Sequence, residues 1–140
     1  MKTILTCAAL LCAALTTPAY AVDMEVEVSG LTQTEGRVMV GVFSDAGTWL
    51  KKGISGASVE ASQQKDGRVL VKLQDLPEGS VGLSVFHDVN GNGRLDSNAM
   101  GMPKEPYGFS NNAACVFGPP KFEKAQFEVK AGARVAVQLN

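Results

Sequence analysis

Apolar and polar residues alternate along most of this chain. The clearest stretches are 23–29, 38–42, 69–73, 81–85, 127–129 and 135–139, where a large apolar residue occupies every second position. Because successive side chains of a strand point to opposite faces, this period predicts strands with one buried and one exposed face. Helical periodicity is nearly absent. Together with a shorter run at 58–63, the pattern predicts an all-β fold, an antiparallel β-sandwich of about seven strands of the immunoglobulin-like kind.

Turn signals separate these runs. Asp66-Gly67 is a two-residue hairpin signal, so we expect the run at 58–63 to pair with the strand that follows it. Ala131-Gly132 predicts a second tight turn. Residues 44–52 are expected to form one short helical segment capped by Ser44 or Asp45, with Trp49 packed against one end of the sandwich.

The segment 97–121 departs from the regular pattern. It contains three glycines and four prolines and has no usable period. A loop of this length in a compact domain is usually functional or needs something to order it. We therefore expect one long ordered loop at a tip of the sandwich.

The first 21 residues read as a cleaved signal peptide. Lys2 precedes an apolar run that is too short for a transmembrane span, and Ala19-Tyr20-Ala21 is a small-x-small cleavage site. Cleavage after Ala21 leaves a single domain, 22–140, and predicts a periplasmic or secreted protein without a transmembrane segment.

The charge of the chain narrows the class of partner, and its cysteine content limits the disulfides that it can form. Residues 22–140 carry 12 basic and 14 acidic side chains with no basic stripe, which argues against nucleic acid as a partner. Only Cys115 follows the predicted cleavage site, so an internal disulfide is impossible there. We expect a buried free thiol at this position.

The strongest chemical signal is the stretch His87-Asp88-Val89-Asn90-Gly91-Asn92-Gly93-Arg94-Leu95-Asp96. Side-chain oxygens fall at alternate positions, followed by a glycine, a backbone carbonyl at position seven and a carboxylate at position nine, as in calcium loops of the EF-hand type. A second carboxylate could return from the long loop. The predicted Ca²⁺ ligands are Asp88, Asn90, Asn92, Arg94 through its carbonyl, Asp96 and Glu105.

This loop also departs from the EF-hand pattern. Ala99 stands where a bidentate carboxylate is expected, and the flanks read as strand and coil. Asn111 or Asn112 could add an amide oxygen. Few charges predict weak calcium binding, with a Kd of about 10⁻⁴ to 10⁻³ M. The alternative is a purely structural Asn-Gly turn that holds no ion.

Residues of the same region suggest two other chemistries. A hydrolase would use His87 with Asp88 or Glu105 as a general base, but the chain offers no recognisable nucleophile. A soft copper site would combine His87 and Cys115 with Met100 and Met102, although spacing alone does not bring these four together.

Two stretches resemble known families. Asp75-Leu76-Pro77-Glu78-Gly79-Ser80-Val81-Gly82-Leu83 resembles the strand entry of transthyretin-like sandwiches, with Val81 in place of the usual tyrosine. The run from His87 to Phe122, with Pro103-Lys104-Glu105, Tyr107-Gly108-Phe109-Ser110-Asn111-Asn112 and Gly118-Pro119-Pro120, resembles a bacterial exported family known as domain of unknown function 2141. The resemblance implies a prealbumin-like sandwich in the cell envelope and no established activity.

These observations predict a non-enzymatic binding or accessory module of the cell envelope. Its tip would be organised by calcium and would present amides and aromatic rings to an envelope protein or a glycan. The oligomeric state stays open.

Overall fold

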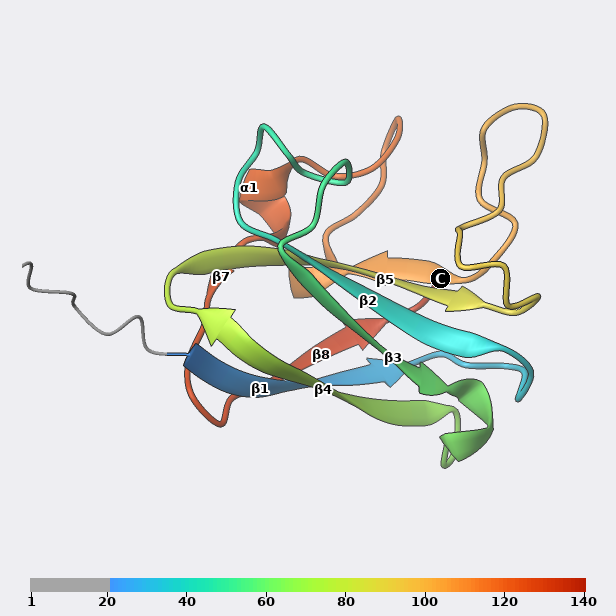
Figure 1. Cartoon of the computed structure of the whole chain (residues 1–140). Coiled ribbons are helices and arrows are strands. Elements are labelled where there is room, and N and C mark those ends of the chain that lie inside the picture. The colour runs from blue at the N-terminus through green and yellow to red at the C-terminus, as the bar shows by residue number, and fades with distance from the viewer. Residues whose placement is uncertain (1–20) are drawn as a thin grey trace, which may run out of the picture.

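A computed structural model describes residues 21–140, which form two packed β-sheets (Figure 1). The predicted signal peptide lies outside the described residues, apart from Ala21. The smaller sheet, sheet A, has the order β4-β1-β8 and contains β1 (Ala21–Ser29), β4 (Arg68–Pro77) and β8 (Arg134–Gln138). No helix within 21–140 is long and apolar enough to cross a bilayer.

The larger sheet, sheet B, has five strands. Its order is β3-β2-β5-β6, and β7 pairs with the start of β5. Its members are β2 (Arg37–Phe43), β3 (Ser55–Glu60), β5 (Ser80–Asp88), β6 (Tyr107–Phe109) and β7 (Phe127–Glu128). The helical pieces are the short 3-10 turns at Ala61–Gln63 and Ser110–Asn112 and the single-turn helix α1 (Phe122–Ala125).

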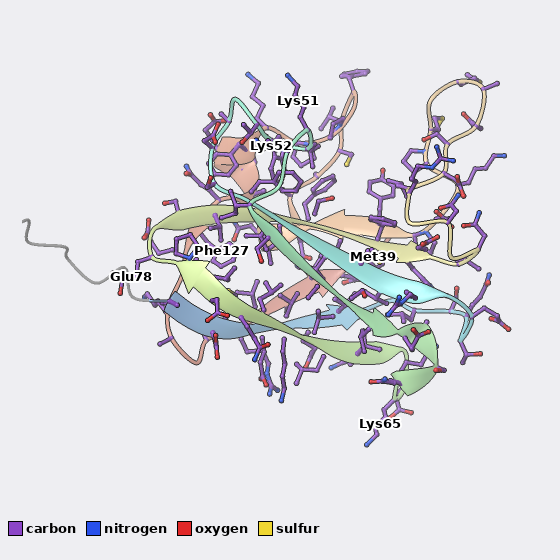
Figure 2. All side chains as sticks on the ribbon, viewed as in Figure 1. Met39, Lys51, Lys52, Lys65, Glu78 and Phe127 are labelled. Carbon is purple, nitrogen blue, oxygen red and sulfur yellow. The ribbon has the colours of Figure 1, made fainter. Side chains whose placement is uncertain are left out.

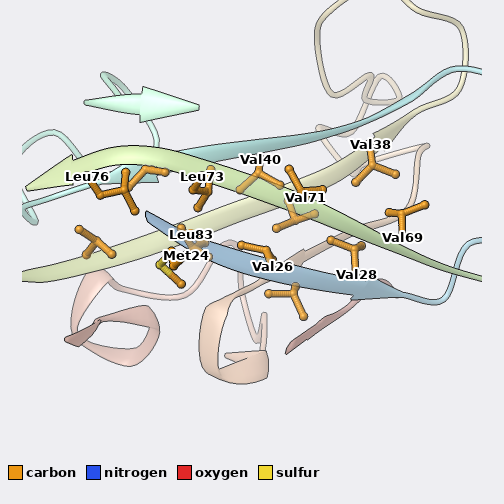
Figure 3. Close-up of a cluster of buried hydrophobic side chains, with 14 of the residues drawn as sticks. Met24, Val26, Val28, Val38, Val40, Val69, Val71, Leu73, Leu76 and Leu83 are labelled. Carbon is orange, nitrogen blue, oxygen red and sulfur yellow. The ribbon is translucent and has the colours of Figure 1, made fainter. Parts of the chain in front are cut away.

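The main core lies between the two sheets, as Figure 3 shows. It is built from the apolar members of each alternating run, and most of them are almost completely buried. Representative residues are Met24, Val26, Val28, Val38, Val40, Val71, Leu73, Leu76 and Leu83. The alternation therefore predicted both the strands and their buried faces, and the all-β sandwich is confirmed.

Strand pairing differs from the expectation at one hairpin. Asp66 and Gly67 do form a turn with positive φ, but only Lys65 and Arg68 pair across it. The 3-10 turn at Ala61–Gln63 ends β3 before a ladder can extend, and β3 pairs with β2 in sheet B instead of with β4. The predicted pairing of 58–63 with the following strand was wrong. The sandwich is also not fully antiparallel, since β1 and β8 run parallel.

The segment 44–52 is a series of turns rather than a helix. Asp45 caps it as expected, because its carboxylate accepts hydrogen bonds from the Thr48 backbone N–H and hydroxyl at 3.0 and 2.7 Å. The amides of Lys51 and Lys52 both donate to the Thr48 carbonyl. The chain leaves these turns at Lys52 and Gly53, so a second helical turn does not form.

A second apolar cluster lies on the outward face of sheet B. Trp49 is at its centre, 9% exposed, and contacts the rings of Phe43, Phe109 and Phe122. Its indole Nε1–H donates to the carbonyl of Pro120 at 2.8 Å. The packing role predicted for Trp49 is confirmed, but the indole packs on the outward face of sheet B and not against an end of the sandwich. The cluster anchors the loops on this face to the sheet.

Candidate functional site

The Asp/Asn loop begins where β5 ends. Alternation along β5 directs His87 toward the core and Asp88 to the outward face. The Asp88 carboxylate is buried beneath its own loop and accepts hydrogen bonds from the amides of Asn92 and Gly93 at 3.2 and 2.7 Å. Asp88 therefore closes the loop onto the end of the sheet.

Asp96 is the second focus of the loop. The side-chain amide of Asn90 donates to Asp96 Oδ2 at 2.5 Å, and that of Asn92 donates to both carboxylate oxygens at 2.9 Å. These bonds, the Asn92 bond first, hold the pKa of the Asp96 carboxyl below its ordinary value of 3.8. The carboxylate thus stays ionised through the neutral range, and the bonds to it weaken only when the pH falls through that lowered pKa.

Glu105 joins the long loop to the Asp/Asn loop. Its two carboxylate oxygens accept hydrogen bonds from the amides of Val89 and Asp96, each at 3.0 Å. The Lys104 amide adds a bond to the Asp96 carbonyl at 2.8 Å. Glu105 is 8% exposed, so these bonds are shielded from water. The structure places Glu105 at the loop, as expected, but engaged with backbone amides.

The donor set suits a hard cation in part. Within residues 21–140 no three His, Cys, Asp or Glu side chains form a metal-binding group, so an ion here depends on amide and carbonyl oxygens as well. Asn90 and Asn92 turn their NH₂ groups toward Asp96, while their oxygens accept from the amides of Asn92 and Arg94. An ion beside Asp96 requires those side-chain amides to rotate and present oxygen.

Asn111 and Asn112 lie away from this loop. Asn111 donates to the carbonyls of Lys124 and Gln126, and Asn112 accepts a bond from the Gln138 amide. The suggestion that either residue adds an oxygen to the cation site was wrong. Both have positive φ, and both hold the long loop to its neighbours.

His87 is completely buried between the sheets. Its Nε2–H donates to the Glu35 carbonyl at 2.7 Å, and its Nδ1 has no hydrogen-bond partner among the described residues. The ring thus faces away from the Asp/Asn loop and from solvent. Burial disfavours a general-base role, which needs contact with a substrate proton. It also separates His87 from the methionines of the copper hypothesis.

An apolar groove of about 820 Å³ lies on the outward face of sheet B. Gly41, Ser84 and Phe86 form its floor, and its walls are the loops at 95–103 and 115–119. Leu95 and Ser97, the two neighbours of Asp96, both line it. The candidate cation loop therefore forms part of the groove wall.

Cys115 is exposed and lines this groove, so the expectation of a buried thiol was wrong. The physical reason is that the loop carrying it stands away from the sandwich core. Tyr107 lies beside it, and the hydrogen bond to Cys115 raises the pKa of the phenol above its ordinary value of 10.0, with burial adding to the shift.

We expect Cys115→Ala to lower the pKa of Tyr107 toward 10.0, because the variant removes the largest cause of the shift. Tyr107 is the single tyrosine of residues 22–140, so ultraviolet titration of phenolate reports it alone. The raised pKa contributes stability that is present below the ordinary pKa and is lost as the pH rises through the folded value. An unchanged titration curve in the variant would contradict this contact.

Sequence reasoning missed the groove and the strand that edges it. The signal for β6 was present, since Tyr107 and Phe109 alternate around Gly108 inside the long loop. Three residues are too few to separate a strand from an irregular loop. The groove itself depends on two loops meeting over a sheet, a contact that no local pattern encodes.

The comparisons with known proteins give a family for this chain and assign no activity to it. Neither the curated proteins nor the solved structures gave a significant match to the chain. The family described as an uncharacterized protein conserved in bacteria (DUF2141) matches residues 26–137, which span nearly the whole sandwich. The chain therefore belongs to the DUF2141 family.

Proposed function

We propose that this protein is an exported binding module whose Asp/Asn loop takes up Ca²⁺ and so fixes one wall of the groove. The observation that carries the proposal is that one segment belongs to both the loop and the groove. The side-chain amides of Asn90 and Asn92 donate to Asp96. Leu95 and Ser97, on either side of Asp96, line the groove. An ion that holds Asp96 also holds the groove wall.

Electrostatics supports the ion. Asp88 and Asp96 are both bound by Asn92, through its backbone amide and its side-chain amide, so the two carboxylates are brought to the same residue. Like charges that share a small loop repel each other, and a divalent cation relieves that repulsion. The ligands would be Asp88, Asn90, Asn92, the Arg94 carbonyl and Asp96, with Glu105 holding the loop closed from behind.

The shape of the groove supports binding. Its volume falls in the range of roughly 300–1,000 Å³ typical of ligand sites, and apolar side chains dominate its walls. Tyr107, Ser84 and Cys115 supply a few polar groups. A concave apolar surface with a few polar groups is the usual form of a binding site. The groove is thus better suited to an apolar partner surface than to a glycan.

Calcium is expected to raise the thermal stability of residues 22–140. At a hundredfold excess over Kd the free energy of unfolding should rise by about 2.7 kcal/mol, a shift of roughly 10 °C for a domain of this size. Scans in EDTA, in Ca²⁺ and in Mg²⁺ at equal ionic strength measure it. Mg²⁺ should give a smaller shift, because it prefers an octahedral shell and loses water reluctantly.

Two variants test whether the calcium-dependent rise in melting temperature arises from the Asp/Asn loop. Asp96→Asn removes one charge from a surface position and should abolish the calcium-dependent rise while the chain still folds. Asp88→Ala should do the same with a lower starting stability, because the buried carboxylate also accepts two backbone hydrogen bonds. A calcium shift of equal size in Asp96→Asn would refute the assignment of the site.

The purely structural alternative makes a different prediction for the same scans. If the loop is an Asn-Gly turn without an ion, the melting temperature depends on ionic strength alone and Ca²⁺ and Mg²⁺ act equally. The hydrolase alternative has less support, since His87 exposes no surface to a substrate.

A further inference from the structure

Three loops extend to the same side of the molecule from the outward face of sheet B (Figure 1). They are the β2–β3 connection at 44–54, the segment 94–104 that follows the Asp/Asn loop, and the segment 113–121 before α1. We call this side the loop face. The groove lies between the second and third of these loops.

Large apolar side chains gather on the loop face. Among the described residues six large hydrophobic side chains are exposed, and five of them belong to these three loops. Phe117 is 106% exposed, Met100 84%, Val116 72% and Met102 60%. Only Leu70 lies elsewhere, on β4. Phe117 and Met100 therefore present their apolar side chains largely to solvent.

The loop face is also cationic on an acidic protein. The three segments carry five basic side chains, Lys51, Lys52, Arg94, Lys104 and Lys121, and two acidic ones. The two acids are already hydrogen-bonded within their own turns, Asp45 with Thr48 and Asp96 with Asn90 and Asn92. Residues 21–140 as a whole carry two more acidic than basic side chains. Positive charge is thus concentrated beside the apolar tips.

The two lysines of the β2–β3 connection extend toward the loop face. In Figure 2 Lys51 and Lys52 extend away from the sheets to the side on which the loops project, whereas Lys65 points to the opposite side. Asp88 and Glu105, the carboxylates at the foot of the second loop, are buried. They present no negative surface to a partner on the loop face.

We infer that the loop face docks on an anionic lipid bilayer. Phe117 and Met100 enter the headgroup region, and the flanking lysines contact lipid phosphates. Interfacial binding needs apolar insertion together with electrostatic attraction, and this face supplies both. Separate protruding tips suit a deformable lipid surface, whereas a stable protein interface needs a continuous, well-packed core. The bilayer is thus the partner of the binding face proposed above, and this inference rests on the binding role of that face and not on its calcium site.

The test is co-sedimentation of residues 22–140 with vesicles of phosphatidylglycerol and phosphatidylcholine, compared with vesicles of phosphatidylcholine alone. All samples contain EDTA, so that calcium cannot bridge protein and lipid. We expect binding to the anionic vesicles that weakens as salt is raised. Lys51→Gln with Lys52→Gln should reduce the partition coefficient about 25-fold, near fivefold for each charge. Phe117→Ala should reduce it about tenfold.

Matched variants on the opposite side serve as controls. Lys65→Gln with Lys72→Gln removes the same charge, and Leu70→Ser removes an exposed apolar side chain from β4. Neither control should alter vesicle binding measurably. All the substituted side chains are on the surface, so each variant is expected to fold, which circular dichroism checks.

Absence of binding to anionic vesicles would overturn the inference, as would equal losses in the loop-face and control variants. Equal binding to phosphatidylcholine alone would also overturn it. The calcium proposal has an independent readout. Calcium-dependent stabilisation without vesicle binding removes the bilayer as partner and leaves the cation site intact.

Discussion

Trp49→Ala is expected to lower the free energy of unfolding by about 4 kcal/mol, within the range for a buried tryptophan replaced by alanine. The indole fills the centre of the outward cluster, with ring centroids 5.1 Å from Phe43 and 5.7 Å from Phe122. Its removal leaves a cavity that three loops cannot close. It also leaves the Pro120 carbonyl without its hydrogen bond.

Urea unfolding followed by far-ultraviolet circular dichroism measures this effect. Trp49→Phe keeps most ring contacts but cannot donate to Pro120, so an intermediate loss is expected. Phe117→Ala removes an aromatic ring of comparable size that packs against nothing, and its effect should stay within about 0.5 kcal/mol. If Trp49→Ala and Phe117→Ala cost the same, the outward cluster does not anchor the loops.

Gly36→Ala is the second substitution with a large expected effect, a loss of about 3 kcal/mol. Gly36 has a φ of +73°, which disfavours any side chain. A Cβ atom here would also lie inside van der Waals contact with the Asp88 carbonyl and 2.7 Å from that of Val89. These atoms are backbone and belong to the start of the Asp/Asn loop, so the clash must displace the loop.

A matched glycine separates the two causes. Gly132 has a φ of +68°, but a Cβ there meets nothing within 4 Å. Gly132→Ala therefore carries only the backbone strain, about 1 kcal/mol. Gly36→Ala should additionally weaken calcium binding, whereas Gly132→Ala should leave it unchanged. Equal losses of stability in the two variants would show that the close approach to Asp88 has no energetic weight.

The alternation of apolar and polar residues predicted the strands and their buried faces, because these depend on residues close together in the sequence. Valine or leucine at every second position settles which face of a strand is buried, so β1, β2, β4, β5 and β8 were expected nearly where they lie. Positive φ at Asp66 and Gly67 was likewise implied by the residue types. The pattern could not decide which strands pair. For example, β3 could pair with β4 at the edge of sheet A or with β2 at the edge of sheet B, and alternation is the same in both cases.

For the candidate site, too, the sequence indicated only the features that depend on neighbouring residues. The spacing from Asp88 to Asp96 indicated a compact loop, and in the structure the Asn92 side chain donates to Asp96 while Glu105 accepts a hydrogen bond from the Asp96 amide. The burial of His87, the exposure of Cys115 and the groove depend on how distant segments pack, and no sequence period encodes them. The sequence therefore indicated the loop, whereas the groove that the loop supports is visible only in the folded chain.

The most direct test of the calcium site is a calcium titration followed by the backbone amide resonances of Asn92 and Gly93, whose N–H groups bind the Asp88 carboxylate. The account predicts saturable shifts at both amides, a Kd of about 10⁻⁴ to 10⁻³ M, and no shift at the remote turn residue Gly132. Asp96→Asn should remove the response. If calcium moves neither amide, or moves them equally in Asp96→Asn, the loop is an ion-free turn and the proposed function is wrong.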